Sequence, residues 1–178
     1  MTLKERYQKE IIPLLEKELG LKNVMAVPHV VSITVSVGLS QGLKDPKFLE
    51  TSENVLKRIT GQKPVSTKAK QSISNFKIRK GMVVGMRVTL RGGHMWSFLD
   101  KLLNVTFPRV RDFRGISKKH IDRSGNITVG FREFLPFPEI RPDEVERIHG
   151  LEVTVTTTAG NKERGALLLK QLGFPFKD

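Results

Sequence analysis

Residues 30–39 read VVSITVSVGL, and this stretch decides the expected architecture of the chain. Apolar and hydroxyl side chains alternate through it, with Ile33, Val35 and Val37 on one side and Ser32, Thr34 and Ser36 on the other. A period of two is that of a β-strand with one buried face. We therefore expect a strand that packs its branched side chains into a core and presents small polar groups on its other face.

Three further stretches, 82–91, 127–131 and 151–157, repeat this alternation. The side opposite the apolar residues is again small or cationic: Arg87, Thr89, Arg91, Thr128, Gly130, Arg132, Thr154 and Thr156. Such a face offers almost no large apolar residue to receive a second layer of helices. The expected fold is therefore α+β, with a mostly antiparallel sheet, helices packed on one face and the other face open.

The helices are expected between these strands. Thr2 and Glu5 form a capping box at the start of a helix that Pro13 should kink, and Asp45-Pro46 starts a second helix. A third helix should end before Pro108, a short one is expected near 143–149, and Gly173 should end the last. An extended piece after Pro64 and a strand around 76–79 complete the expected elements. We predict one domain over residues 1–178, with a basic loop at about 65–81.

Charge is the strongest functional signal in the composition. The 178 residues carry a formal net charge of +13. No Asp or Glu occurs between Glu53 and Asp100, and lysines and arginines are frequent in that interval. Basic residues that are segregated from acids in this way indicate a polyanionic partner, and nucleic acid is favoured over an ordinary lysine-rich surface.

Signatures of other function classes are missing from the sequence. There is no cysteine, and the four histidines show no metal-ligand spacing, so neither a metal nor a cofactor is expected. No phosphate-binding glycine loop or nucleophile motif occurs, which argues against an enzyme. The N-terminal residues do not read as a signal peptide, and no stretch is apolar enough to cross a bilayer, so we expect a cytoplasmic protein without a membrane partner.

The open face also indicates which nucleic acid it would bind. It lacks the exposed aromatic residues on which single-stranded RNA stacks. None of the expected helices presents the Arg, Asn or Gln residues that read the major groove of DNA. Short hydroxyls and guanidinium groups instead suit a folded RNA that is recognised by its backbone and shape.

Several motifs resemble one protein family: GQKP at 61–64, TKAKQSISNFKIRKG at 67–81, RVTLRG at 87–92, MWSFLDKLLN at 95–104, PRVRDFRG at 108–115 and FPEI at 137–140. In their order along the chain, up to GFPF at 173–176, they are similar to the bacterial-type large-subunit ribosomal protein of the universal L-five family. The resemblance implies a ribosomal protein of the central protuberance, beside 23S rRNA and other proteins of that region, which binds 5S rRNA through the open face. It further implies a basic loop near the P-site tRNA and a bridge to a small-subunit head protein.

The resemblance also assigns residues. Together with the sheet face, the 5S rRNA-binding set comprises Thr34, Ser36, Gln62, Lys63, Arg87, Thr89 and Arg91. The tRNA-facing loop comprises Lys70, Ser72, Ser74, Asn75, Phe76 and Lys77. The inter-subunit bridge comprises Arg109, Arg111, Asp112, Phe113 and Arg114. Ser36 stands where relatives usually have asparagine, so it has no amide donor.

Some alternatives stay open at this level. Phe76 on a strand would favour a core position, whereas an exposed Phe76 could stack on a nucleotide. Arg87 and Arg91 could pair with Glu152 or Glu133 across the sheet rather than contact RNA. An RNA-modifying enzyme would need a deep pocket with converging polar groups. A non-ribosomal RNA chaperone would bind different RNAs without preference.

Overall fold

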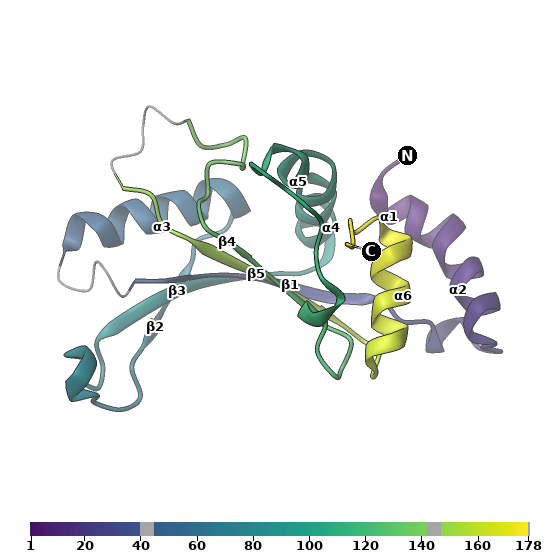
Figure 1. The fold of residues 1–178 in the computed structure, drawn as a ribbon, viewed down its shortest axis with the longest axis horizontal. Coiled ribbons are helices and arrows are strands. Elements are labelled where there is room, and N and C mark those ends of the chain that lie inside the picture. The colour runs from purple at the N-terminus through teal and green to yellow at the C-terminus, as the bar shows by residue number, and fades with distance from the viewer. Residues whose placement is uncertain (40–44, 142–146, 178) are drawn as a thin grey trace. The chain divides into compact units, whose positions relative to one another are not determined.

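The computed structural model describes residues 1–39, 45–141 and 147–177 (Figure 1). The chain forms two compact units. Unit 1 comprises Met1–Ile33, Leu90–Val129 and Thr154–Asp178, and unit 2 comprises Thr34–Thr89 and Gly130–Val153. Four of the five strands pass from one unit into the other, because the unit boundaries fall within or at the ends of these strands.

Five strands form one sheet in the order β2-β3-β1-β5-β4. Their bounds are β1 Val30–Gly38, β2 Val65–Lys68, β3 Val83–Leu90, β4 Ile127–Phe131 and β5 Leu151–Thr157. β2 pairs antiparallel with β3, so that Val65 lies opposite Arg87 and Thr67 lies opposite Gly85. The sheet is antiparallel, which confirms the predicted α+β class.

In the described part of unit 2, one long helix lies against its part of the sheet (Figure 1). Asp45 caps α3 (Pro46–Thr60) by accepting a hydrogen bond from the Lys47 N–H, and Gly61 ends the helix in a left-handed conformation. The residues of α3 that face the core are buried: Phe48, Ser52, Val55, Leu56, Ile59 and Thr60. The 3.6-residue period therefore packs one helical stripe on the branched side of the strands, as the sequence predicts.

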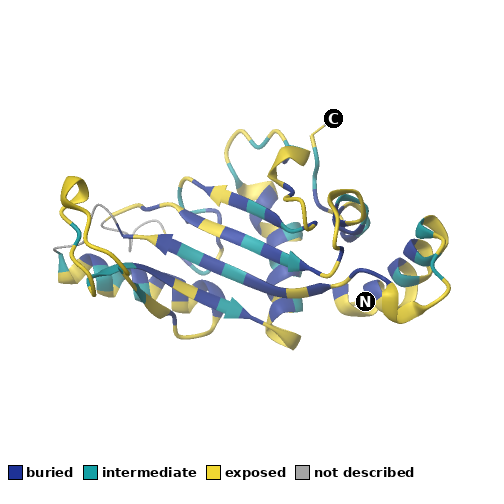
Figure 2. Cartoon of the chain, turned by 90° about the horizontal axis from the view of Figure 1, so that it is seen from below, coloured by how far each residue is buried: buried dark blue, intermediate teal, exposed yellow. Residues whose placement is uncertain are grey.

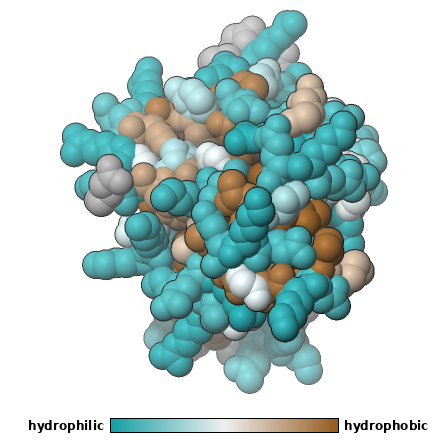
Figure 3. All heavy atoms as spheres, turned by 90° about the vertical axis from the view of Figure 1, so that its right-hand side faces the viewer, coloured by the Kyte–Doolittle hydropathy of each residue, from teal (hydrophilic) through white to brown (hydrophobic). Residues whose placement is uncertain are grey.

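Unit 1 contains the remaining helices. They are α1 (Leu3–Arg6), α2 (Ile12–Leu19), α4 (Gly92–Lys101), α5 (Phe107–Arg109) and α6 (Lys162–Leu172). Figure 3 views the molecule from the side of α2 and α6, where hydrophilic atoms predominate and hydrophobic patches lie among them. The Tyr7 ring lies 5.2 Å from the Trp96 ring, and its hydroxyl donates to the Pro28 carbonyl at 3.0 Å. Burial raises the pKa of Tyr7 to about 12.

Two prolines shape these helices in the same way. A π-helical turn, Tyr7–Ile11, precedes α2, which has Pro13 as its second residue, and another, Leu102–Thr106, precedes α5, which has Pro108 as its second residue. A proline has no N–H to donate and its ring crowds the preceding turn, and a wider turn relieves that crowding. The predicted distortion at Pro13 is therefore observed. The prediction that the third helix ends before Pro108 is wrong, because the chain stays helical as far as Arg109.

Two other predicted elements differ. The strand predicted around 76–79 is absent, because Ser74–Phe76 form a 3-10 turn and only an isolated bridge joins Ile73 to Ile78. Lys77 has a φ of 55°, a left-handed conformation that interrupts an extended chain. The helix predicted near 143–149 lies mostly outside the described residues, and residues 147–149 are not helical.

Candidate RNA-binding surface

The polar side of the sheet in unit 2 is accessible to solvent. Thr34, Ser36 and Thr89 are half-buried, as expected for short side chains between neighbours, and Arg87 is exposed. Figure 2 shows buried residues alternating with more exposed ones along β1, β4 and β5. The alternation predicted from the sequence therefore produces an accessible polar face. In unit 1, Ser32 is an exception, because it is 7% exposed and too deeply buried to contact a partner.

Two of the predicted 5S rRNA-binding residues lie together. The Gln62 side-chain amide donates to the Thr89 carbonyl oxygen at 3.5 Å, and the Gln62 backbone N–H donates to the Thr60 hydroxyl at 3.3 Å. These contacts hold the exposed amide at the end of β3. Lys63 beside it lies 3.9 Å from Glu53, and because both side chains are exposed, this ion pair restrains Lys63 only weakly.

The arginines of the face are not neutralised within the described part of the chain. No ion pair among the described residues involves Arg87 or Arg91, and both residues are exposed. The alternative in which they pair with Glu152 or Glu133 across the sheet is therefore absent from the structure. Their guanidinium groups are left available to an anionic partner such as phosphate.

The loop between β2 and β3 carries the residues predicted to face tRNA. Lys70, Ser72, Ser74, Asn75, Phe76 and Lys77 are all exposed. Phe76 is 70% exposed, so the core position favoured by its expected strand is wrong. The 3-10 turn at 74–76 puts the ring at the end of the hairpin, where no second layer covers it. The same loop contains a groove of about 670 Å³, lined by Ser72, Ser74, Lys77, Ile78, Arg79 and Met82.

The predicted bridge residues lie in unit 1 and differ in their exposure to solvent. Arg109, Arg111, Asp112 and Arg114 are exposed. Phe113 instead turns inward, and its ring stacks on the buried Phe107 ring at a centroid distance of 5.4 Å. Phe113 therefore holds the loop on the unit, while the three arginines present charge to solvent.

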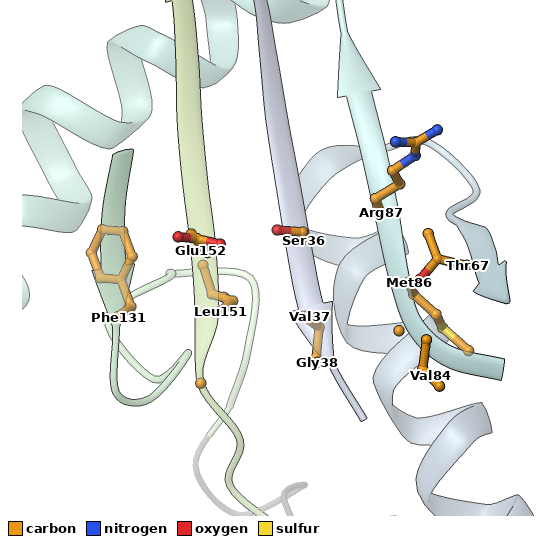
Figure 4. A pocket seen from close by; sticks show the side chains of 12 residues that line it. Ser36, Val37, Gly38, Thr67, Val84, Met86, Arg87, Phe131, Leu151 and Glu152 are labelled. Atoms are coloured by element: carbon orange, nitrogen blue, oxygen red, sulfur yellow. The ribbon is translucent and has the colours of Figure 1, made fainter. Parts of the chain in front are cut away.

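Sequence analysis missed an open hollow of about 480 Å³ on the polar face of unit 2 (Figure 4). Three glycines, Gly38, Gly85 and Gly150, contribute bare backbone to its lining. The polar side chains of the lining are Ser36, Thr67, Arg87 and Glu152. The position of Glu152 could have been predicted from the sequence, because it lies two residues from Thr154 in the same strand and therefore points to the same face. Thr67 could be found only from the β2–β3 register, which places it opposite Gly85.

Residues 23–79 match the family described as Ribosomal protein L5, and residues 83–176 match the model that describes the C-terminus of the same ribosomal family. The chain belongs to the ribosomal L5 family. It is 50% identical to the large ribosomal subunit protein uL5 of Francisella tularensis subsp. novicida over 175 residues, which are 98% of each chain. It is 49% identical over 177 residues to the protein of that name from Thermotoga maritima, covering 99% of this chain and 96% of the relative.

Similarity extends to other bacteria. The uL5 protein of Roseiflexus sp. is 48% identical over 176 residues, which cover 99% of this chain and 98% of the relative. A member of this L5 family is a structural constituent of the large ribosomal subunit that associates with rRNA, and it is not an enzyme. None of the helices in the described ranges is long and apolar enough to span a membrane.

Proposed function

We propose that this L5-family protein binds 5S rRNA in the central protuberance through the polar sheet face, and that it does so in the bacterial cytoplasm. The binding set is Thr34, Ser36, Gln62, Lys63, Arg87, Thr89 and Arg91. The observation that carries the proposal is that hydroxyl side chains and the unpaired guanidinium group of Arg87 share the accessible face of unit 2. Guanidinium groups would bind phosphates, and the short hydroxyls would let the backbone approach and pair with 2′-OH groups.

The proposal extends to two further contacts. The loop of Lys70, Ser72, Ser74, Asn75, Phe76 and Lys77 would contact the P-site tRNA, supported by its charge and by the exposed Phe76 ring. Arg109, Arg111, Asp112 and Arg114 would contact a small-subunit head protein, with Phe113 anchoring their loop. Neighbouring 23S rRNA and other proteins of the central protuberance would complete the surroundings.

A binding titration tests the main proposal. The full chain is titrated with bacterial 5S rRNA and with a structured RNA of equal length and unrelated sequence, both at the same salt concentration. We expect clear preference for 5S rRNA and an affinity about tenfold lower for Thr89→Ala, the range of one lost polar contact. Ser66→Ala is the matched control, because Ser66 is an exposed hydroxyl residue of β2 that lies opposite the buried Met86 and so belongs to the other side of the sheet.

The same titration separates the proposal from its rival. Equal affinity for the two RNAs would favour a non-specific RNA chaperone and would overturn the proposed 5S rRNA role. We also propose that residues 1–178 act as one domain with a basic loop at about 65–81, since four strands are shared by both units. Coincident thermal transitions of Trp96 fluorescence and backbone circular dichroism are then expected.

A further inference from the structure

Glu152 is an unusual residue for a surface that binds a polyanion. It is exposed, and it is the one acidic side chain among the twelve residues that line the hollow on unit 2. Figure 4 shows its carboxylate between the Phe131 ring and Ser36, with Arg87 farther along on the opposite side of the hollow. The hollow therefore has a cationic side at β3 and an anionic side at β5.

No cation among the described residues forms an ion pair with this carboxylate. A phosphate placed against it would be repelled, at a cost that grows as water leaves the interface. An RNA that covers this face must therefore present hydrogen-bond donors at the β5 side, whereas phosphates would lie at Arg87.

The donors that RNA can present are few. They are the 2′-hydroxyl and the amino and imino groups of the bases. A carboxylate has two acceptor oxygens, and the Watson–Crick edge of guanine has two adjacent donors, the N1–H and the N2 amino group. Guanine alone among the four bases offers two parallel donors without an acceptor between them. The match requires that this edge is not already paired with cytosine.

The floor of the hollow permits such a base to enter. A Cβ atom added at Gly85 would lie 2.8 Å from the Val37 carbonyl oxygen and 2.9 Å from the Thr67 hydroxyl. One added at Gly150 would lie 2.9 Å from the Phe131 carbonyl oxygen. At these two positions the neighbouring chain already occupies the place of a Cβ, so the glycines let the backbones of the floor lie close together. At Gly38, a third glycine of the lining, an added Cβ would meet nothing within 4 Å, so the space above it is open to a planar group.

We propose that Glu152 recognises an unpaired guanine of the bound RNA, accepting hydrogen bonds from its N1–H and N2 amino group. This inference rests on the proposed function and adds a base-reading residue to a face otherwise expected to contact the RNA backbone. Arg87 binds an adjacent phosphate, and Ser36, whose hydroxyl points toward the strand of Glu152 in Figure 4, is placed to contact the ribose. Glu152 thus contributes sequence preference, whereas Arg87 contributes affinity.

Whether one substitution raises or lowers the affinity for RNA distinguishes guanine recognition by Glu152 from simple repulsion of phosphates. If Glu152 only repels phosphates, Glu152→Gln removes a negative charge and tightens binding of bacterial 5S rRNA. If Glu152 reads guanine, Glu152→Gln weakens binding about tenfold, the range for losing one arm of a bidentate base contact. Glu163→Gln is the matched control, because Glu163 is an exposed acid at the start of α6 and is not among the residues that line the hollow.

Inosine interference locates the base. Inosine lacks the N2 amino group of guanine, so 5S rRNA transcripts carrying scattered inosines are partitioned between bound and free fractions. With the wild-type chain, we expect inosine to be depleted from the bound fraction at one unpaired guanosine. With Glu152→Ala that depletion disappears, while binding of the uniform transcript remains measurable through the rest of the face.

Each outcome has a distinct meaning. Tighter binding by Glu152→Gln, or an interference pattern identical in wild type and Glu152→Ala, would overturn the guanine-reading role and leave 5S rRNA binding intact. If the wild-type chain showed no preference for 5S rRNA over the control RNA, the proposed function would instead be overturned. Circular dichroism of each variant confirms that it is folded before binding is compared.

Discussion

Two basic loops of this protein have similar composition but differ in how they contact the rest of the protein. The tip loop, residues 69–82, joins β2 to β3, and the anchored loop, residues 110–126, joins α5 to β4. Each contains one phenylalanine among lysines and arginines. In the tip loop Phe76 is 70% exposed, whereas in the anchored loop Phe113 stacks on Phe107. The comparison teaches that charge identifies a contact surface, while the apolar neighbours decide whether its aromatic residue faces solvent or core.

The backbones of the loops differ in the same way. The tip loop is closed only upon itself: Ile73 and Ile78 exchange two hydrogen bonds at 2.9 and 3.1 Å. The anchored loop is clamped by the C-terminal segment, where the Ile116 N–H donates to Pro175 at 2.8 Å and the Lys177 N–H donates to Ile116 at 2.9 Å. Contacts from a distant part of the chain therefore fasten the anchored loop to unit 1. The tip loop should therefore open more readily than the anchored one.

The largest effect is expected from Phe107→Ala. Phe107 is 1% exposed and packs against both Phe113 and Phe174. Its removal leaves a cavity and should lower the free energy of unfolding by about 3–5 kcal/mol. Phe76→Ala should change it by less than about 0.5 kcal/mol, because the Phe76 ring is mostly exposed to solvent. Chemical denaturation of both variants checks this pair, and similar losses would refute the contrast.

The second effect concerns glycines with positive φ in the two loops. Gly115 and Gly81 have φ values of 86° and 90°, so an alanine at either position should cost about 1–2 kcal/mol of backbone strain. A Cβ at Gly115 would also lie 3.0 Å from the Lys177 nitrogen, whereas none of the atoms around Gly81 comes within 4 Å. We expect Gly115→Ala to be destabilising by a further ~1–3 kcal/mol. Equal melting temperatures for the two variants would show that the clamp yields without cost.

The binding of tRNA should depend on Phe76 more than on Phe107, which reverses the order of their expected effects on stability. Phe76→Ala should weaken the binding of P-site tRNA to reconstituted ribosomes by about 1–2 kcal/mol, the lower part of the range for a stacked base. Phe76→Leu serves as the control that keeps an apolar side chain but lacks a ring to stack. Retention of full tRNA affinity by Phe76→Ala would remove the stacking role from the tip loop.

The smallest expected effect is a pH dependence of stability and of amide resonances that arises in the anchored loop alone. At the end of this loop, burial tends to raise the pKa of Asp122, but hydrogen bonds from Asn126, Ser124 and Gly125 outweigh it and hold the pKa below its ordinary value. A lowered pKa stabilises the fold above the unfolded-state value, and that contribution is lost as pH falls through the folded-state value. The tip loop contains no carboxylate, so its amide resonances should not follow this titration.

Nuclear magnetic resonance can follow that titration residue by residue. The Ser124 and Asn126 amides donate to Asp122 at 2.9 and 2.8 Å, so their chemical shifts should move together at acid pH. Asp122→Asn keeps an acceptor oxygen but cannot ionise, and it should abolish the shared movement. Persistence of the movement in this variant would assign it to another group.

Much of the sheet could be predicted because its signal is local. A strand with one buried face must alternate apolar and polar residues. Ile33, Val35 and Val37 show this pattern within the strand itself, so it can be recognised without information about neighbouring strands. The accessible Thr34, Ser36 and Thr89 followed from the same parity. The capping box at Thr2 and Glu5 is likewise contained within four residues and is present, with the Glu5 N–H donating to Thr2 at 3.3 Å.

Other features depend on contacts that no local pattern contains. The tip loop was expected to continue as a strand, yet no partner strand pairs with it beyond Ile78, and Phe76 is exposed as a result. The helix was expected to stop at Pro108, yet burial of Phe107 beside Phe113 and Phe174 keeps that turn in the core. The hollow escaped notice because it needs Thr67 to lie across from Gly85, and that pairing is a property of strand register.

By itself, the sequence determined the alternating strands, the segregation of charge and the polar character of one sheet face, because each is a periodicity or a count within a short stretch of chain. Tertiary structure alone decided which phenylalanine is buried, which arginines stay unpaired and which residues meet around the hollow with Glu152. The physical reason is that burial, ion pairing and register are set by residues far apart along the chain that become neighbours only when the chain is folded.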